Sequence, residues 1–180
     1  MQHEIIFAGF GGQGILLIGQ MVAYSGMDVG LNVTWLPSYG PEMRGGTASC
    51  TVVVSDTPIG SPVVSSPEIA VVMNRPSLDK FGPMVRKGGL LFINSSLVDV
   101  RSGRSDIEEI LIPCNDMAAK LGNPRAANII MLGALIGRTK ILSDSAIKGR
   151  IKYAFEKKGE DLVKFNYKAF DEGAKAALAR

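Results

Sequence analysis

The fold of this chain is decided by the stretch Glu4-Ile5-Ile6-Phe7-Ala8-Gly9-Phe10-Gly11-Gly12-Gln13-Gly14. Its apolar run predicts a strand, and the pattern G-x-G-x-x-G then leads into an apolar segment that predicts a helix over 15–25. This order is typical of a phosphate-binding turn, although a tight turn without a ligand has the same pattern. We expect Gly9 to take the turn, Gly11 to admit a phosphate, and Gly14 to let the helix lie close to the strand.

The rest of the chain alternates between predicted strands and predicted helices. Short apolar runs predict strands over 32–36, 49–54, 69–73, 90–93 and 110–112. Helical patterns follow over 78–85, 116–121, 126–137, 143–155 and 160–178, the last two amphipathic and expected at the periphery. Asn115 is the expected N-cap of its helix, and the stretch 37–46, with three glycines and two prolines, is expected to be irregular.

This alternation predicts an α/β fold: a Rossmann-like, open and mostly parallel sheet with flanking helices, in a single domain over residues 1–180. Ligands of such sheets bind beyond the carboxyl ends of the strands. Besides the glycine turn, the expected strand exits carry Asn74, Asn94 and the guanidinium groups of Arg44 and Arg75. These groups predict a crevice for an anionic or polyhydroxylated ligand, or for a docked loop of another subunit.

Composition excludes several classes of protein. The net charge of +3 is small, and the basic stretch 148–152 alternates with apolar residues as a solvated helix face does, so no nucleic-acid partner is expected. No apolar run reaches the roughly 20 residues of a membrane span. Cys50 and Cys114 are far apart, which excludes an iron–sulfur or zinc site made by this chain alone and suits a reducing cytoplasm. We expect no metal site and no catalytic residue here.

The glycine turn lacks the partner that a dinucleotide dehydrogenase provides. Such an enzyme places Asp or Glu at the end of the second strand, where it binds the adenosine ribose. Here that strand ends in Trp35-Leu36-Pro37-Ser38, and Asp28 precedes the strand. Binding of NAD is therefore disfavoured.

Two motifs together resemble the gamma subunit of the 2-oxoacid:ferredoxin oxidoreductases. They are Gly9-Phe10-Gly11-Gly12-Gln13-Gly14 and Tyr39-Gly40-Pro41-Glu42-Met43-Arg44-Gly45-Gly46. Support comes from Met73-Asn74-Arg75-Pro76-Ser77, Asn94-Ser95-Ser96 and Asn123-Pro124-Arg125-Ala126-Ala127-Asn128, so the resemblance covers nearly the whole chain. The form of the second motif is closer to the 2-oxoglutarate and branched-chain enzymes than to the pyruvate enzymes.

The resemblance implies an assembly that is inactive without its partners. Alpha, beta and ferredoxin-like delta subunits would carry thiamine diphosphate, Mg²⁺ and iron–sulfur clusters, and the whole would oxidise a 2-oxoacid, such as 2-oxoglutarate, to an acyl-CoA and reduce ferredoxin. This chain would help to bind coenzyme A. The residues implied in cofactor binding are Gly9, Gly11, Gly12, Gln13, Gly14, Arg44, Asn74 and Asn94, and those of a substrate or interface loop are Tyr39, Glu42, Arg44 and Asn128.

Other roles for these residues stay open. Arg44 and Glu42 are equally well explained by an ion pair with each other or with a neighbouring subunit. Tyr39 fits a packing or interface aromatic, and Asn128 fits a polar group at a helix start. Asn74 and Asn94 fit strand-exit turns. For the whole chain, the alternatives are a free-standing nucleotide-binding module or NAD-type reductase, and a purely structural role.

Overall fold

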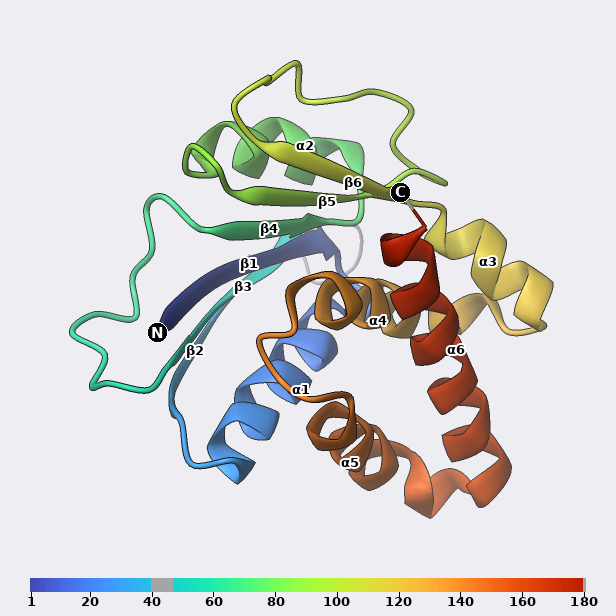
Figure 1. Cartoon of the computed structure of the whole chain (residues 1–180). Helices are drawn as coiled ribbons and strands as arrows, with labels where there is room; N and C mark the ends of the chain where they lie inside the picture. The colour runs from blue at the N-terminus through green and yellow to red at the C-terminus, as the bar shows by residue number, and fades with distance from the viewer. Residues whose placement is uncertain (40–46, 180) are drawn as a thin grey trace.

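The computed structural model describes residues 1–39 and 47–179, which form one six-stranded sheet with helices on both faces (Figure 1). The strands are β1 (Gln2–Phe10), β2 (Asn32–Tyr39), β3 (Thr47–Ser55), β4 (Ile69–Val72), β5 (Leu90–Asn94) and β6 (Glu108–Ile112). The helices are α1 (Ile15–Asp28), α2 (Arg75–Phe81), α3 (Cys114–Leu121), α4 (Ala127–Thr139), α5 (Asp144–Phe155) and α6 (Glu160–Leu178). Short 3-10 turns are η1 (Gly82–Met84), η2 (Pro124–Ala126) and η3 (Glu156–Lys158).

The sheet has the order β2-β3-β1-β4-β5-β6, and β1, β4, β5 and β6 are parallel to their neighbours in that group. This confirms the prediction of a mostly parallel open sheet. β3 is the exception, because it pairs antiparallel with both β1 and β2. No helix separates β2 from β3 among the described residues, and the link at 40–46 is too short for the crossover that parallel strands need.

β2 is longer than predicted. The pairing with β3 continues through Pro37 and Ser38 to Tyr39, so the expectation of irregular structure is wrong for these three residues. Proline lacks a donor N–H. It is tolerated here because β2 is an edge strand, and the backbone groups on its outer side form no hydrogen bonds with another strand. The rest of the predicted irregular stretch, 40–46, lies outside the described residues.

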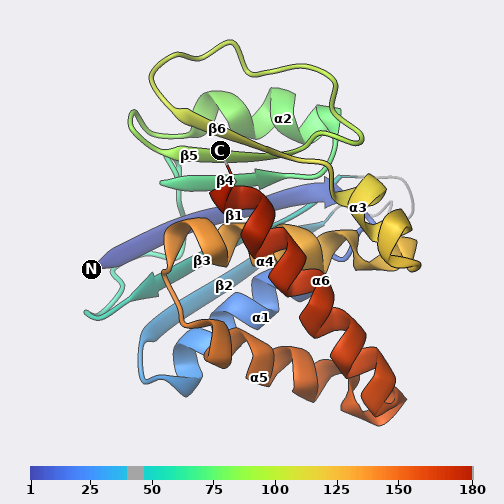
Figure 2. The same cartoon turned by 45° about the vertical axis from the view of Figure 1, so that its right-hand side comes forward.

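The two faces of the sheet have separate cores. Ile5 and Phe7 of β1 face a large core shared with α1 and α4, whereas Ile6 and Ala8 face a small core shared with α2. Figures 1 and 2 show α1, α4, α5 and α6 on one side of the sheet and α2 on the other. The burial alternates because successive side chains of a strand point to opposite faces.

α4 and α6 cross at very short distance. A Cβ on Gly133 would lie 2.0 Å from the Phe170 carbonyl oxygen, and one on Gly173 would lie 1.9 Å from the Ile130 carbonyl oxygen. α6 is amphipathic as predicted and lies at the outside of the helical layer (Figure 2), with one stripe of residues buried against α4: Val163, Asn166, Ala169, Phe170, Gly173 and Ala177. Within the described part of the chain, no helix is both long and apolar enough to cross a membrane.

Candidate functional site

A cavity of about 360 Å³ opens where the glycine turn meets the end of β4 and the first turns of α3 and α4. Figure 1 shows the carboxyl ends of β1, β4, β5 and β6 pointing toward the side where α3 lies. The residues that line the cavity and matter for its chemistry are Gly12, Gln13, Gly14, Asn115, Arg125 and Asn128. The site therefore lies at the edge of the sheet where the sequence predicts it.

Three helix N-termini converge on this cavity. Gly14 directly precedes α1, Asn115 is the second residue of α3, and Ala127 is the first residue of α4; all three residues line the cavity. The first N–H groups of a helix have no partner within it, and the helix dipole adds positive potential there. Side chains of Asn94, Ser96 and Asn128 accept some of these groups at α3 and α4, whereas α1 has no side-chain cap among the described residues. The lining residues include no carboxylate, and Arg125 adds a guanidinium. The cavity is therefore suited to an anion with several oxygen atoms, such as a phosphate.

The glycines of the turn have roles that differ from the predicted ones. Gly9 is not in the turn but in β1, paired with Ala48, and a Cβ there would lie 2.6 Å from Gln13 Oε1 and 2.9 Å from Ile15 Cγ1. Its role is close packing. The turn itself uses Gly12 and Gly14, whose φ angles of 95° and 73° are left-handed. A side chain is strained in this region, so the turn requires glycine at both positions.

Gly14 approaches α4 rather than its own strand. A Cβ on Gly14 would lie 2.2 Å from Asn128 Nδ2, and the same amide donates a hydrogen bond to the Gly14 carbonyl oxygen at 3.3 Å. Asn128 is 6% exposed and also accepts the Ile129 N–H through Oδ1. Asn128 is thus a polar group at a helix start, which was the alternative to a role in a substrate or interface loop. It fixes the glycine turn against α4.

The Gln13 side chain holds the turn in shape. Its Oε1 accepts the Phe10 N–H at 2.6 Å, and its Nε2 donates to the Met73 carbonyl oxygen at 3.3 Å. Both ends of the amide therefore bind the protein, and the turn is tied to the end of β4.

Asn74 and Asn94 act at helix starts. Asn74 Oδ1 accepts the Ser77 N–H and so caps α2, while its Nδ2 is buried and has no partner among the described residues. Asn94 Oδ1 accepts the Cys114 N–H at 3.2 Å and its Nδ2 donates to Asn115 Oδ1 at 2.8 Å. Neither asparagine lines the cavity. Their predicted contact with a cofactor stays a prediction.

The expected N-cap of α3 is wrong. Asn115 lies inside the first turn, and the free N–H groups of Cys114 and Asp116 are instead accepted by Asn94 Oδ1 and Ser96 Oγ from the β5 exit. A cap contributed by another segment leaves no local sequence pattern. It also leaves Asn115 at the cavity wall, a position that its predicted role as a cap does not include.

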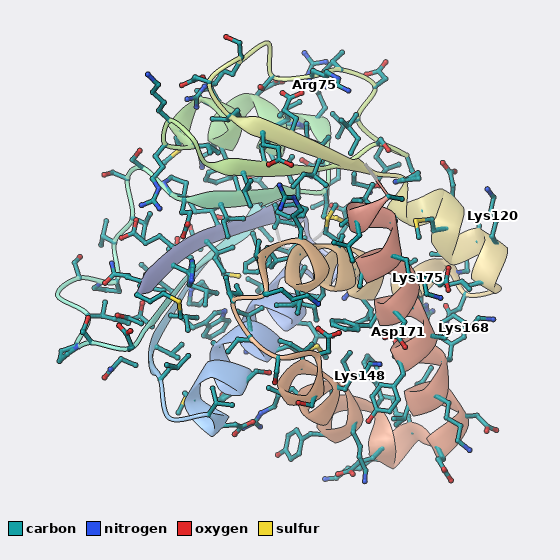
Figure 3. The ribbon with its side chains drawn as sticks, in the orientation of Figure 1. Arg75, Lys120, Lys148, Lys168, Asp171 and Lys175 are labelled. Atoms are coloured by element: carbon teal, nitrogen blue, oxygen red, sulfur yellow. The ribbon has the colours of Figure 1, made fainter. Side chains whose placement is uncertain are left out.

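The guanidinium at the cavity is Arg125 and not Arg75. Arg75 binds Asp79 within α2 at 2.8 Å, and Figure 3 shows it on the α2 side of the sheet. Arg125 is exposed at the cavity, and no carboxylate pairs with it within residues 1–39 and 47–179. Sequence reasoning missed it as a site residue, although the stretch 123–128 was recognised as a motif.

The remaining predictions concern the second motif. Glu42 and Arg44 lie outside the described residues, as does the side chain of Tyr39, so their predicted roles stay predictions.

Asp28 forms an ion pair with Arg150 of α5 at the end of α1, away from the strand exits. The basic stretch 148–152 lies on α5, and two of its three cations pair with carboxylates: Arg150 with Asp28, and Lys148 with Asp171. Figure 3 shows Lys148 and Asp171 between α5 and α6, where their charged groups are 2.6 Å apart.

Both cysteines are buried and free. Burial raises the pKa of the Cys50 thiol to about 12, although the Trp35 indole opposes the shift, and burial also raises the pKa of the Cys114 thiol. Neither thiol is a nucleophile at neutral pH. In the part of the chain that the structure describes, no three His, Cys, Asp or Glu side chains gather to hold a metal ion.

Comparison with known proteins identifies relatives over nearly the whole chain. The chain is 38% identical over 176 residues to "Ketoisovalerate oxidoreductase subunit VorA" of Methanothermobacter thermautotrophicus, covering 97% of this chain and 36% of the relative. It therefore spans little more than a third of that relative's length. It is 34% identical over 180 residues to "2-oxoglutarate synthase subunit KorC" of Methanocaldococcus jannaschii, covering 98% of this chain and 95% of the relative.

Two solved structures share the fold. A 2-oxoglutarate:ferredoxin oxidoreductase from Magnetococcus marinus, solved with 2-oxoglutarate, coenzyme A and succinyl-CoA bound, superposes with a TM-score of 0.92 at 25% identity, covering 99% of this chain and 31% of that one. The gamma subunit of a keto/oxoacid ferredoxin oxidoreductase from Geobacter sulfurreducens gives a TM-score of 0.86 at 28% identity, covering 99% and 98%. The model of the pyruvate ferredoxin/flavodoxin oxidoreductase family matches residues 4–176, and this chain belongs to that family.

Proposed function

We propose that this chain is the gamma-type subunit of a 2-oxoacid:ferredoxin oxidoreductase and that its cavity binds the phosphates of coenzyme A. The observation that carries the proposal is the convergence of three helix N-termini and Arg125 on one carboxylate-free cavity. Support comes from the Magnetococcus structure, which was solved with coenzyme A bound, and from the Geobacter gamma subunit of matching length.

The cavity residues fit a pyrophosphate. Gly12 is exposed, and a Cβ built on it would meet no atom within 4 Å among the described residues, so its main chain borders open space. Gly14 at the start of α1 has no capping side chain in that same part of the chain, which leaves the first N–H groups of the helix available. A phosphate there would accept these N–H groups and face the Arg125 guanidinium.

Coenzyme A, when bound, supplies the thiol that receives the acyl group. In this proposal the chain's own residues hold its phosphates, and the glycine turn, fixed by Gln13 and Asn128, keeps the donors in place before the ligand arrives. Thiamine diphosphate, Mg²⁺ and iron–sulfur clusters belong to alpha, beta and delta partner subunits in the cytoplasm, and ferredoxin accepts the electrons of the assembly.

We propose 2-oxoglutarate as the substrate of the assembly. The KorC relative, which this chain matches over nearly its whole length, is named a 2-oxoglutarate synthase subunit. The VorA relative is named for ketoisovalerate, and the match spans only part of it. A direct comparison of 2-oxoglutarate with 2-oxoisovalerate as substrates of the reconstituted enzyme decides between them.

The replacement Arg125→Ala tests the assignment of the cavity. It removes the guanidinium, and we expect the KM for coenzyme A to rise roughly tenfold or more in the enzyme reconstituted with its partner subunits, because one charge-assisted hydrogen bond is lost. The KM for the 2-oxoacid should stay unchanged. Reduction of ferredoxin or a dye, measured against coenzyme A concentration, gives both values.

Arg75→Ala is the matched control. This arginine is also exposed and follows a strand exit, but it binds Asp79 on the other side of the sheet. Its replacement should leave the KM for coenzyme A unchanged. Equal effects of the two variants, or no effect of Arg125→Ala, would show that coenzyme A is bound elsewhere.

A further inference from the structure

Asn115 lines the cavity at the glycine turn, and its side-chain amide has two different ends. The oxygen accepts hydrogen bonds, and the NH2 group donates them. Phosphate oxygens bind donors and are repelled by acceptors. The orientation of this one amide therefore decides whether Asn115 helps or hinders an anion in the cavity.

The orientation of Asn94, at the end of β5, is fixed by backbone groups. Its Oδ1 accepts the N–H of Cys114 at 3.2 Å and the N–H of Ser96 at 3.3 Å. A backbone N–H only donates, so the atom that meets both groups is the oxygen. Asn94 is 0% exposed, and turning its amide over would place the NH2 group against two donors and leave them unsatisfied. Its Nδ2 is thereby left to donate elsewhere.

The amide of Asn115 is oriented by that of Asn94. Asn94 Nδ2 donates to Asn115 Oδ1 at 2.8 Å, so the Asn115 oxygen is directed toward a residue that does not line the cavity. Asn115 Nδ2 forms no hydrogen bond within residues 1–39 and 47–179, and the side chain is only half-buried. Because the two ends of an amide point in different directions, the NH2 group is turned away from Asn94 and is available to a ligand in the cavity.

The same strand exit also holds the carboxylate that follows Asn115 in sequence. Ser96 Oγ donates to Asp116 Oδ2 at 3.0 Å and accepts the Asp116 N–H at 3.1 Å. Asp116 does not line the cavity. The segment Asn94-Ser95-Ser96 thus orients a donor at the cavity wall and binds the neighbouring negative charge outside it.

We infer that Asn115 binds the anion in this cavity through Nδ2, and that Asn94 is the positioning residue that presents this donor. The inference rests on the proposed function, since it needs an anion in the cavity. It adds a side-chain donor from α3 to the backbone groups of the glycine turn and to Arg125. It also gives Asn94 a role at the site that needs no direct contact with a cofactor.

Nuclear magnetic resonance on the full ¹⁵N-labelled chain tests the contact at Asn115. Inorganic pyrophosphate at millimolar concentration should shift the side-chain NH2 signals of Asn115 and the backbone signals of the glycine turn. The NH2 signals of Asn32 are the control, because this exposed residue pairs with Ser55 at the opposite edge of the sheet. Shifts at the turn without a shift at Asn115 overturn the inference.

The replacement Asn94→Asp tests the positioning. The new carboxylate still accepts the N–H groups of Cys114 and Ser96, but it cannot donate to Asn115. The Asn115 amide should then turn over, donate to this carboxylate and present its oxygen to the cavity. In the enzyme reconstituted with its partner subunits, we expect the KM for coenzyme A to rise roughly tenfold, with kcat and the KM for the 2-oxoacid unchanged.

Asn115→Ala separates positioning from a general effect of the new charge or of the fold. Alone, it should raise the KM for coenzyme A severalfold, because one hydrogen bond to the anion is lost. In its background, Asn94→Asp should add little, since no amide is left to turn over. A full effect of Asn94→Asp without Asn115 refutes the positioning role. Asn32→Ala, at the opposite edge of the sheet, should leave all these constants unchanged.

The outcomes distinguish this inference from the proposed function. If Arg125→Ala weakens coenzyme A but Asn115→Ala does not, the phosphate cavity stands and the role of Asn115 is refuted. If neither variant changes the KM for coenzyme A and pyrophosphate shifts no signal of the glycine turn, both proposals are refuted together.

Discussion

The glycine turn and the α4–α6 crossing both depend on glycine, but for opposite physical reasons. At the turn, Gly12 and Gly14 have left-handed φ angles, and a Cβ on Gly12 would find open space. At the crossing, Gly133 and Gly173 lie within helices and have backbone of the other helix within 2.0 Å of where a Cβ would be. The turn uses the conformational freedom of glycine, which leaves backbone exposed. The crossing uses the small size of glycine, which lets the backbones of two helices pack against each other.

The largest effect is expected at the crossing. Gly133→Ala or Gly173→Ala places a methyl group against a backbone carbonyl that cannot move aside, and we expect a loss of about 3 kcal/mol or more in the free energy of unfolding. Thermal denaturation measures it. Gly149→Ala is the control, because Gly149 lies in α5 with nothing near its Cβ position among the described residues. It should stabilise by about 0.5–1 kcal/mol. Equal stability of all three variants would contradict the close crossing.

An intermediate effect is expected at the turn, where backbone strain can be separated from steric crowding. Gly12→Ala and Gly14→Ala each introduce left-handed strain of about 1–2 kcal/mol. Gly14→Ala also displaces Asn128, so it should lower the melting temperature more than Gly12→Ala does. Both should raise the KM for coenzyme A, since the methyl groups border the cavity. A Gly12→Ala enzyme with normal KM would show that the ligand does not approach this backbone.

The smallest effect concerns the Cys50 thiol, which lies beside the start of α1, next to the glycine turn. The pKa of Cys50 is raised by burial from an ordinary value of 9.0 to about 12, so the unfolded chain loses its proton first as the pH rises. The stabilisation is therefore present below about pH 9 and is lost as the pH rises toward the folded pKa, by about 1 kcal/mol near pH 9.5. Denaturant titrations at pH 7 and 9.5 measure this difference in the wild-type chain, with Cys50→Ala as the control.

Much of the fold was predictable because its signals are local. The apolar strand before Gly9, the buried helix over 126–137 and the unbroken strand over 69–73 are patterns within a few residues, and each is confirmed to within a few positions. The resemblance to the gamma subunits also depends on short motifs, and the family match over residues 4–176 confirms it. Antiparallel β3 was not predicted, since strand direction depends on a pairing partner and not on the strand's own residues.

The site was predicted in part. The glycine turn was found, and Asn128 was named, because both lie in recognisable motifs. Arg125 was missed as a site residue, and Arg75 was expected at the crevice in its place. The two arginines look alike in sequence: each follows a strand or turn and precedes a helix. Only the side of the sheet on which the helix packs distinguishes them.

The sequence by itself determined the family and the strand–turn–helix opening, because periodicity and backbone freedom are properties of neighbouring residues. The tertiary structure alone decided that three helix N-termini share one cavity, that Asn128 touches Gly14 across 114 residues of chain, and that α6 lies against α4. Contacts over such distances are set by how whole elements pack. No window of sequence contains both partners.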